Sequence, residues 1–410
     1  MSTVLGIIAE YNPFHNGHLY QIEEAKRNTG AEYVVAVISG NFTQRGNTSI
    51  VDKWKKAQMA IENGVDIVLE LPTIYSISSA ENFAEGAVKI LDSLKIVDTL
   101  CFGTETADFA ALNNIANVLH NEPKEYSAIL THELGKGISY PKARENALMM
   151  YLNDVRRYAN ILSGQNNILA VEYLKAIKKL KSDMQPYSVQ RKKVYYNDEK
   201  IVDEFASSTA IRKLIAMEQY DDLRKVMPKS SYMILKQQIE KENYVIDLIK
   251  YEKEILYTLR KMSVSEISEL PDVSEGLEYS IKNAANSCNN LIELVNIIKS
   301  KRYAQTRIQR ILVYALLGIT KKDMQNSKKI VPYTRVLGFN SKGREMLSDI
   351  CAINSKIQMV TSVKKYMEQN NNRILREMLE KDIFATNVYT LGYGSDSWAN
   401  LDYTNKLVII

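Results

Sequence analysis

The sequence predicts an α/β fold in which a parallel, doubly wound sheet is followed by a mainly helical, basic part. Over the first hundred residues, apolar runs of strand length alternate with helical patterns, and these runs lack a strict two-residue alternation. Strands of that kind are buried on both faces, as they are where helices cover both sides of a parallel sheet. From about residue 228 the pattern becomes helical and rich in Leu, Ile, Lys and Glu.

Each element of the first part has its own signal. Strands are expected at 4–10, 33–39, 65–72 and 97–103, and helices at 18–27, 52–64 and 80–94. Gly64 closes the second of these helices, because glycine is favoured just after a helix. A further strand at 185–191 precedes a short helix that Ser207 or Ser208 could cap.

These patterns also predict the domain boundaries. Residues 1–220 should form a catalytic-looking domain with a helical excursion at about 105–180. Residues 221–380 should form a mainly helical domain, and residues 381–410 a C-terminal tail whose runs FATNVYTLGYG and NKLVII favour short strands.

Composition excludes several classes of protein. The chain has 410 residues, of which 45% are hydrophobic and 25% charged, as in soluble globular proteins. No run of eighteen apolar residues and no basic segment ahead of the short N-terminal apolar run occur, so we expect neither a membrane span nor a signal peptide. The three cysteines are far apart and outside any C-x-x-C pair. They predict reduced thiols in a cytoplasmic protein and no metal site.

Two of the four histidines, His15 and His18, lie between the first strand and its helix. An H-x-G-H turn can bring both imidazoles to the helix N-terminus, where Gly17 allows a close backbone approach and exposed amides favour an anion. Two imidazole N–H donors could then stabilise charge that develops on a phosphate. Histidines that only hydrogen-bond the backbone are the alternative, and zinc is disfavoured because a third ligand is missing.

The charged residues are distributed unevenly. Residues 299–344 contain twelve basic residues and one acid, a net charge of +11, while the chain carries +5 and the remainder therefore −6. Such a block is typical of a polyanion-binding surface, although a solvated basic helix is the alternative. A helical register puts Tyr303, Arg307 and Arg310 on one face, away from the apolar stripe. The candidate RNA-binding residues are Arg302, Tyr303, Arg307, Arg310, Lys328, Lys329 and Arg335.

Two motifs resemble a known superfamily. NPFHNGH after the first strand resembles the H-x-G-H signature of nucleotidylyltransferases, and SSTAIR (207–212) resembles their second signature, which lies near the triphosphate. The resemblance implies a Rossmann-like nucleotidyltransferase domain. The wider set of GIIAEYNPFHNGH, SGNFTQRG, IVDKW, ELP, FGTE, NNILAVEYL and the basic helical part resembles the bacterial tRNA(Met) cytidine acetate ligase family over essentially the whole chain.

This resemblance implies a reaction and its substrates. Members of the family activate acetate with ATP, giving acetyl-adenylate and pyrophosphate, and then acetylate N4 of the wobble cytidine (C34) of elongator tRNA(Met). Acetate is already an anion, so the first step needs positioning and charge stabilisation, and no protein nucleophile. Magnesium is expected with the triphosphate. No obligate protein partner and no membrane partner are expected.

The resemblance also implies residue roles. His15, His18 and Arg212 would be catalytic. The ATP-binding residues would be Ile7, Ile8, Ala9, Glu10, Tyr11, Asn12, Pro13, Phe14, His15, Asn16, Gly17, His18, Leu19, Tyr20, Gly103, Asn167, Arg191, Lys192, Ser208 and Thr209.

Several alternatives remain open from the sequence. Gly103 is also compatible with a plain turn, Asn167 and Ser208 with helix caps, and Arg45 with the acetate pocket, the triphosphate pocket or the surface. A small-molecule adenylyltransferase of the phosphopantetheine or nicotinamide-nucleotide type would explain both signatures but not the basic part. A non-catalytic RNA-binding protein would explain the basic part but not the signatures.

Overall fold

The structure, a computed structural model, describes residues 3–191, 204–241, 245–274, 276–300, 303–353, 357–396 and 398–410. One sheet runs through its centre. Its strands are β1 (Val4–Ala9), β2 (Tyr33–Ser39), β3 (Ile67–Leu71), β4 (Thr99–Thr104), β5 (Gln185–Gln190), β6 (Thr334–Phe339), β7 (Met359–Val360) and β8 (Val408–Ile409). The strand order is β5-β4-β1-β2-β3-β6-β7, and β8 pairs with β6.

The five N-terminal strands form the parallel, doubly wound half of the sheet that the sequence predicts. All of their pairings are parallel. From β1 the chain builds outward to β3 and then returns to add β4 and β5 on the other side of β1. The crevice at the carboxyl ends of β1 and β4 is therefore the topological switch point, where sheets of this kind bind ligands.

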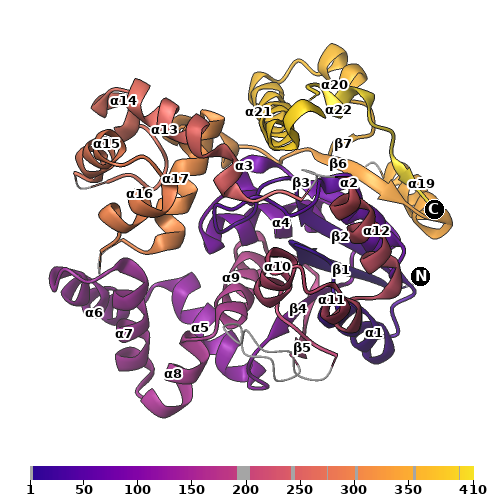
Figure 1. The fold of residues 1–410 in the computed structure, drawn as a ribbon. Helices are drawn as coiled ribbons and strands as arrows, with labels where there is room; N and C mark the ends of the chain where they lie inside the picture. The colour runs from indigo at the N-terminus through magenta and orange to yellow at the C-terminus, as the bar shows by residue number, and fades with distance from the viewer. Residues whose placement is uncertain are drawn as a thin grey trace.

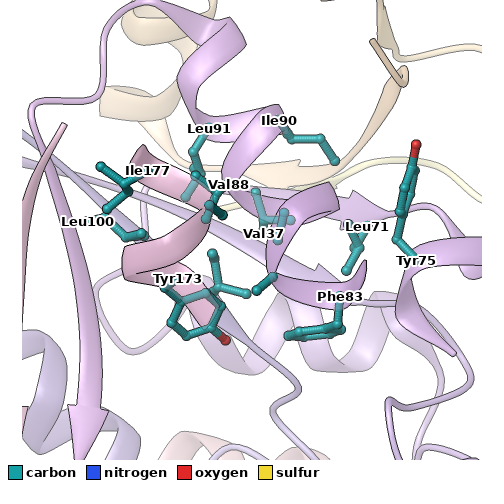
Figure 2. Packing of buried hydrophobic residues seen from close by; sticks show 14 of the residues in the cluster. Val37, Leu71, Tyr75, Phe83, Val88, Ile90, Leu91, Leu100, Tyr173 and Ile177 are labelled. Carbon is teal, nitrogen blue, oxygen red and sulfur yellow. The ribbon is translucent and has the colours of Figure 1, made fainter. Parts of the chain in front are cut away.

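Helices cover both faces of this half (Figure 1). They are α1 (Asn16–Thr29), α2 (Lys53–Ile61), α3 (Thr73–Ser76), α4 (Ala80–Leu94), α9 (Gln165–Leu180) and α10 (Ser208–Ala216). Figure 2 shows how α4 and α9 bury one face: Val88 and Leu91 of α4 and Ile177 of α9 pack over Val37 and Leu71 of the sheet. The other face packs against α1, α2 and α10.

The helical excursion lies between β4 and α9. Its helices are α5 (Phe109–Asn121), α6 (Lys124–Gly135), α7 (Tyr140–Leu152) and α8 (Val155–Leu162). In Figure 1 they form a group at the lower left of the sheet. Among the described residues, no helix combines the length and hydrophobicity that crossing a membrane requires.

The basic part contributes a second helical group. Its helices are α11 (Tyr220–Val226), α12 (Lys229–Glu240), α13 (Glu252–Lys261), α14 (Val264–Ser268), α15 (Leu277–Ser287), α16 (Leu291–Ile298), α17 (Gln305–Leu317) and α18 (Lys321–Ser327), with a 3₁₀ turn at Leu248–Tyr251. The core formed by α13 and α15 to α17 also takes in Phe42, from the loop after β2. The ring of Phe42 lies 6.2 Å from that of Tyr389 and 6.5 Å from that of Tyr251, measured between centroids.

The observed organisation corrects the predicted second and third domains. β6, β7 and β8 extend the central sheet, with β6 antiparallel to β3. Leu223 of α11 and Leu235 of α12 belong to the core of the parallel half. The remaining helices are α19 (Ser341–Ala352), α20 (Val363–Gln369), α21 (Arg373–Thr390) and α22 (Leu401–Thr404), with a 3₁₀ segment at Leu391–Asp396.

The C-terminal run FATNVYTLGYG was predicted as a strand, but most of it is helical. It continues α21, whose buried face includes Leu379, Ile383 and Thr386 at helical spacing. Burial against the rest of the protein therefore outweighs the β propensity of Val, Tyr and Thr. The second run, NKLVII, does contain a strand, β8.

A buried network of charged side chains joins the C-terminal segment to the sheet. The Nζ atom of Lys53 lies 2.9 Å from Glu70 Oε1 and 2.7 Å from Asp402 Oδ1. Arg335 Nη1 donates to the same Asp402 oxygen at 2.5 Å. All four residues are buried. Burial alone would raise the pKa of Asp402, but Lys53 and Arg335 outweigh it and lower that pKa.

Replacing Lys53 should expose the strength of this network. We expect Lys53→Met to lower the free energy of unfolding by about 3–5 kcal/mol, because two carboxylates stay buried with one cation fewer. Urea unfolding gives the measurement. Lys142→Ala, which removes one member of an exposed pair with Glu145, is the control and should leave the midpoint nearly unchanged. A loss for Lys53→Met no larger than that of the control would contradict the role of the network.

Candidate active site

A pocket opens at the carboxyl ends of β1, β4 and β5, between α1 and α10 on one side and α4 and α9 on the other. It is lined by Ile8, Ala9, Glu10, Tyr11, Asn12, His15, Gly17, His18, Tyr20, Gln21, Thr43, Gln44, Arg45, Asn47, Phe83, Phe102, Gly103, Asn166, Leu169, Tyr173, Val189, Arg191, Phe205, Ala206, Ser207, Ser208 and Arg212. The two signature motifs, almost 200 residues apart in the chain, meet here.

The two signature histidines cap the helix that follows them. His15 is the N-cap of α1, and its Nδ1 accepts the backbone N–H of Gly17 at 3.1 Å. The Nδ1 of His18 accepts the backbone N–H of His15 at 3.2 Å. The two rings stack with centroids 3.8 Å apart. A side chain at position 17 would bring its Cβ within 2.9 Å of the His15 ring, so only glycine leaves room for this fold of the loop.

This reciprocal capping fixes the protonation of both rings. Each Nδ1 is an acceptor, so the proton of the neutral imidazole is on Nε2. Burial, together with the positive charge of Arg191, lowers the pKa of His18 to about 3. Burial also lowers the pKa of His15 well below its usual value, and His18, Arg191 and Arg212 add to the effect. Both histidines are therefore neutral Nε2–H donors at pH 7.

The neighbouring groups hold this pair in place. His15 Nε2 lies 3.2 Å from Ser208 Oγ, which joins the first signature to the second. Tyr11 meets the His18 ring edge-on, at 4.9 Å between centroids. Arg212 donates from Nη1 to the carbonyl of Asn12 at 2.9 Å.

Two helix N-termini converge on the pocket. α1 begins beside His15, and α10 begins at Ser208 with Ser207 as its N-cap, whose Oγ accepts the backbone N–H of Ala210. Helix N-termini attract anions through their free amides and dipoles. With the guanidinium groups of Arg191 and Arg212 in the lining, this side of the pocket suits a polyphosphate.

The loop after β2 forms the rim beside β1. Gln44 donates its backbone N–H to Glu10 Oε1 at 2.7 Å, and Arg45 Nη2 donates to Gln165 Oε1 at the start of α9. Beneath the loop, the buried Lys56 Nζ lies 2.6 Å from the Ser39 carbonyl and 3.0 Å from the Glu10 carbonyl. Burial lowers the pKa of Lys56 to about 7.

The predicted ATP-binding residues divide into three groups. Those that line the pocket are Ile8, Ala9, Glu10, Tyr11, Asn12, His15, Gly17, His18, Tyr20, Gly103, Arg191 and Ser208, with the predicted catalytic Arg212. Those outside the lining are Ile7, Pro13, Phe14, Asn16, Leu19, Asn167 and Thr209. Lys192 lies outside the described residues.

The residues outside the lining support the site. Phe14 is fully buried, with its ring centroid 5.5 Å from that of His18. Asn16 Nδ2 donates to the Glu204 carbonyl at 2.9 Å, and Thr209 Oγ1 accepts from Arg212 Nη2 at 3.2 Å.

Asn167, which was predicted to contact the nucleotide, lies outside the lining of the pocket. Its side chain is buried, and its Oδ1 accepts the backbone N–H of Glu105 at 2.9 Å. The carboxylate of Glu105 in turn accepts the backbone N–H groups of Asn166 and Asn167, at 3.0 and 2.8 Å. This reciprocal pair fixes the start of α9, and the neighbouring Asn166 lines the pocket.

Sequence reasoning missed the wall that α4 and α9 provide. Phe83, Leu169 and Tyr173 look like core residues because they follow the apolar periodicity of their helices. Only the packing of α4 and α9 over the carboxyl ends of the strands brings these residues to the pocket. The contribution of the loop after β2 was easier to foresee, since Arg45 follows a predicted parallel strand.

The structure corrects two of the predicted RNA-binding residues. Arg310 is buried rather than solvent-facing, and its Nε donates to Asp272 Oδ2 at 2.7 Å. Arg335 belongs to the buried network with Asp402. Helical periodicity put Arg310 on the polar face of α17, but the chain at Asp272 covers that face.

The other basic candidates lie at or near the surface. Lys328 and Lys329 are exposed. Arg307 is half-buried: its guanidinium lies 5.1 Å from the centroid of the Tyr303 ring, and its Nε donates to the Asp272 carbonyl at 2.8 Å. Arg302 lies outside the described residues.

Comparisons with known proteins identify the family. The sequence model of the HIGH Nucleotidyl Transferase family, the class that the histidine pair and the doubly wound sheet define, matches residues 1–402. The tRNA(Met) cytidine acetate ligases of Thermoanaerobacter sp. (strain X514) and Acetivibrio thermocellus are 45% and 41% identical to this chain. The alignments cover 99% of this chain in both cases, and 99% and 100% of the relatives.

Solved structures agree with the sequence relatives. Thermotoga maritima TmcAL is 32% identical, and its crystal structures without ligand and bound with alpha-thio ATP match this fold with TM-scores of 0.95 and 0.93. Each match covers 100% of this chain and 99% of the other. The chain belongs to the tRNA(Met) cytidine acetate ligase family of HIGH nucleotidyl transferases.

The protonation of the histidine pair can be measured directly. In the ligand-free protein we expect His15 and His18 to stay neutral at pH 5, with the proton on Nε2, because burial disfavours their charged forms. Nuclear magnetic resonance of ¹³C,¹⁵N-labelled histidine reports both charge and tautomer, and His18→Gln assigns the signals. Titration of all four histidines near pH 6.5 would contradict the arrangement.

The same shifts have a consequence for stability. The pKa of His18 is about 3 in the folded protein and about 6.5 in the unfolded chain, so the unfolded chain takes up the proton first as the pH falls. The free energy of unfolding should therefore decrease from about pH 6.5 downward. His18→Gln should show a shallower decrease over this range in urea unfolding.

Proposed function

We propose that this protein is an ATP-dependent tRNA(Met) cytidine acetate ligase. It activates acetate as acetyl-adenylate, releases pyrophosphate, and then acetylates N4 of the wobble cytidine of elongator tRNA(Met). The observation that carries the proposal is the neutral histidine pair, held beside Ser208 and Arg212 where two helices begin. Relatives that match the full length favour this activity over adenylylation of a small-molecule acceptor.

In the first step, the protein binds the triphosphate and stabilises the charge that develops at the α-phosphate. An acetate oxygen attacks the α-phosphorus, and the bond to the bridging oxygen breaks with release of pyrophosphate. The Nε2–H groups of His15 and His18 suit the α-phosphate oxygens, because neutral donors fixed in advance need no reorganisation as charge builds up. Arg191 and Arg212 suit the β- and γ-phosphates.

Magnesium would enter with the triphosphate. Among the described residues, no group of three or more His, Cys, Asp or Glu side chains is positioned to hold a metal ion. This agrees with an ion bound mainly by phosphate oxygens and water, the usual arrangement for magnesium with nucleotides. Its chemistry would be to neutralise the leaving pyrophosphate.

In the second step, the acetyl group passes to RNA. The N4 nitrogen of cytidine attacks the acetyl carbonyl, and AMP leaves. Lys328 and Lys329 are suited to guide the tRNA toward the pocket, because the chain around them packs on α3 and α4: the carbonyl of Ser327 accepts from Tyr75 OH at 2.7 Å, and that of Ile330 accepts from Lys89 Nζ at 2.6 Å. Tyr303, just before α17, and Arg307, in its first turn, are further candidates. A tRNA substrate implies work in the cytoplasm.

Exchange of pyrophosphate into ATP tests the first step. We expect exchange that depends on acetate and falls about 10²–10³-fold in His18→Asn, with a much smaller change in ATP affinity. Asparagine keeps an acceptor near the position of Nδ1 but lacks the Nε2–H donor, so α1 stays capped. His18→Gln, with an amide near the Nε2 position, should retain more activity. Absence of exchange with acetate, alone and with bulk tRNA, would refute the proposed activity.

The basic surface gives a second test. Lys328→Glu combined with Lys329→Glu should weaken binding of tRNA and reduce its dependence on salt, while acetate-dependent exchange stays unchanged. Lys342→Glu is the matched control. Lys342 belongs to the same basic block and is exposed, but it lies beside Tyr33, at the edge of the sheet opposite the pocket. Equal weakening by both variants would mean that this surface has no specific role.

A further inference from the structure

The two walls of the pocket differ in chemistry. The wall formed by α1 and α10 carries the groups suited to phosphates, including His15, His18 and Ser208. The opposite wall is formed by α4, α9 and the loop after β2. Its apolar members are Phe83, Leu169 and Tyr173, and its cation is Arg45. A triphosphate has no use for an apolar wall, so this side suits either the adenosine or the acid to be activated, and the cation Arg45 favours the acid.

The position of Arg45 is set by a tight loop. Gly46 N donates to the Thr43 carbonyl at 3.0 Å, and Thr43 N donates to the Asn47 carbonyl at 2.8 Å. Gly46 has a φ of +73°, and a Cβ there would lie 2.3 Å from the backbone nitrogen of Arg310 in α17. Only glycine fits between the loop and α17. The conformation of the loop is therefore restricted, and Arg45 points toward the start of α9.

The guanidinium can bind a ligand from this position. Its contact with Gln165 orients it, and a guanidinium has five N–H donors in a planar fork that matches a carboxylate. Glu10 brings a negative charge to the same end of the pocket, with one oxygen held by the backbone of Gln44. A negatively charged substrate bound there would need a nearby cation to offset the negative charge of Glu10.

The apolar wall restricts the size of the ligand. Phe83 and Tyr173 belong to the core shown in Figure 2 and are 2% and 4% exposed. The ring of Tyr173 also packs on Phe102, with centroids 5.7 Å apart. Side chains held so firmly do not move aside easily, because a packed core resists deformation.

We propose that this wall is the acceptor subsite, in which Arg45 binds the carboxylate of the acid to be activated and Phe83, Leu169 and Tyr173 enclose its methyl group. Selectivity for a two-carbon acid would then come from the wall that α4 and α9 supply. This inference rests on the proposed function. In the step itself, one carboxylate oxygen forms the bond to the α-phosphorus, pyrophosphate leaves with the electrons of the broken bond, and no proton is transferred.

The test measures pyrophosphate exchange with acetate, propionate and butyrate. Arg45→Gln should raise the KM for acetate about tenfold or more, the loss expected for a charge-assisted contact, and change the KM for ATP far less. Arg45→Lys should give an intermediate value. Arg157→Gln, in α8 and outside the pocket, is the matched control, and it should behave as the wild type.

Enlarging the apolar wall tests the second half of the proposal. Leu169→Ala should reduce the preference for acetate over propionate about tenfold, because each methylene accommodated in such a pocket is worth roughly that factor. Leu169 is only partly buried, so the variant should fold.

The outcomes separate this inference from the proposed function. Suppose that the wild type shows acetate-dependent exchange and that Arg45→Gln raises the KM for ATP and the KM for acetate equally. Arg45 would then be assigned to the triphosphate, and the proposed subsite would be overturned. An unchanged acetate KM would overturn it as well, as would an unchanged acid preference in Leu169→Ala. No acetate-dependent exchange in the wild type, even with tRNA, would overturn the proposed function itself.

Discussion

The buried amino group of Lys56 lies where the parts of the candidate active site meet. Its Nζ is within 3.0 Å of the carbonyls of Ser39, Gly40 and Glu10 and of the hydroxyl of Ser49. Those acceptors belong to the ends of β1 and β2 and to the loop that presents Arg45. Unpaired backbone carbonyls are costly in a buried crevice, and the Lys56 Nζ hydrogen-bonds to three of them. The shape of the rim depends on this interaction.

The histidine pair combines structural and chemical tasks in the same atoms. Each Nδ1 satisfies a backbone N–H at the start of α1, and this contact fixes the tautomer that leaves Nε2–H as a donor. Burial keeps both rings neutral, because a charged imidazole would lose its solvation. The pair can therefore donate hydrogen bonds to an anion such as phosphate while both rings stay uncharged.

The basic residues of the C-terminal half do not form a single exposed surface. Sequence density alone suggests one basic surface, yet Arg335 and Arg310 neutralise buried or partly buried carboxylates, Asp402 and Asp272. Lys328 and Lys329 remain exposed. Ion pairs across distant segments are invisible in a linear sequence, so the count of +11 overstates the charge available to RNA.

The sequence by itself determined the parallel half of the sheet and the position of the histidine pair, because apolar runs, caps and H-x-G-H spacing are local signals. It also identified the SSTAIR segment as a helix start. Only the tertiary structure decided that β6 and β8 complete the catalytic sheet and that Phe83 and Tyr173 face the pocket. It also showed that Asn167 and Glu105 together hold the start of α9. These outcomes depend on contacts between residues far apart in the chain, and periodicity reports only which side of an element is apolar, not what that side meets.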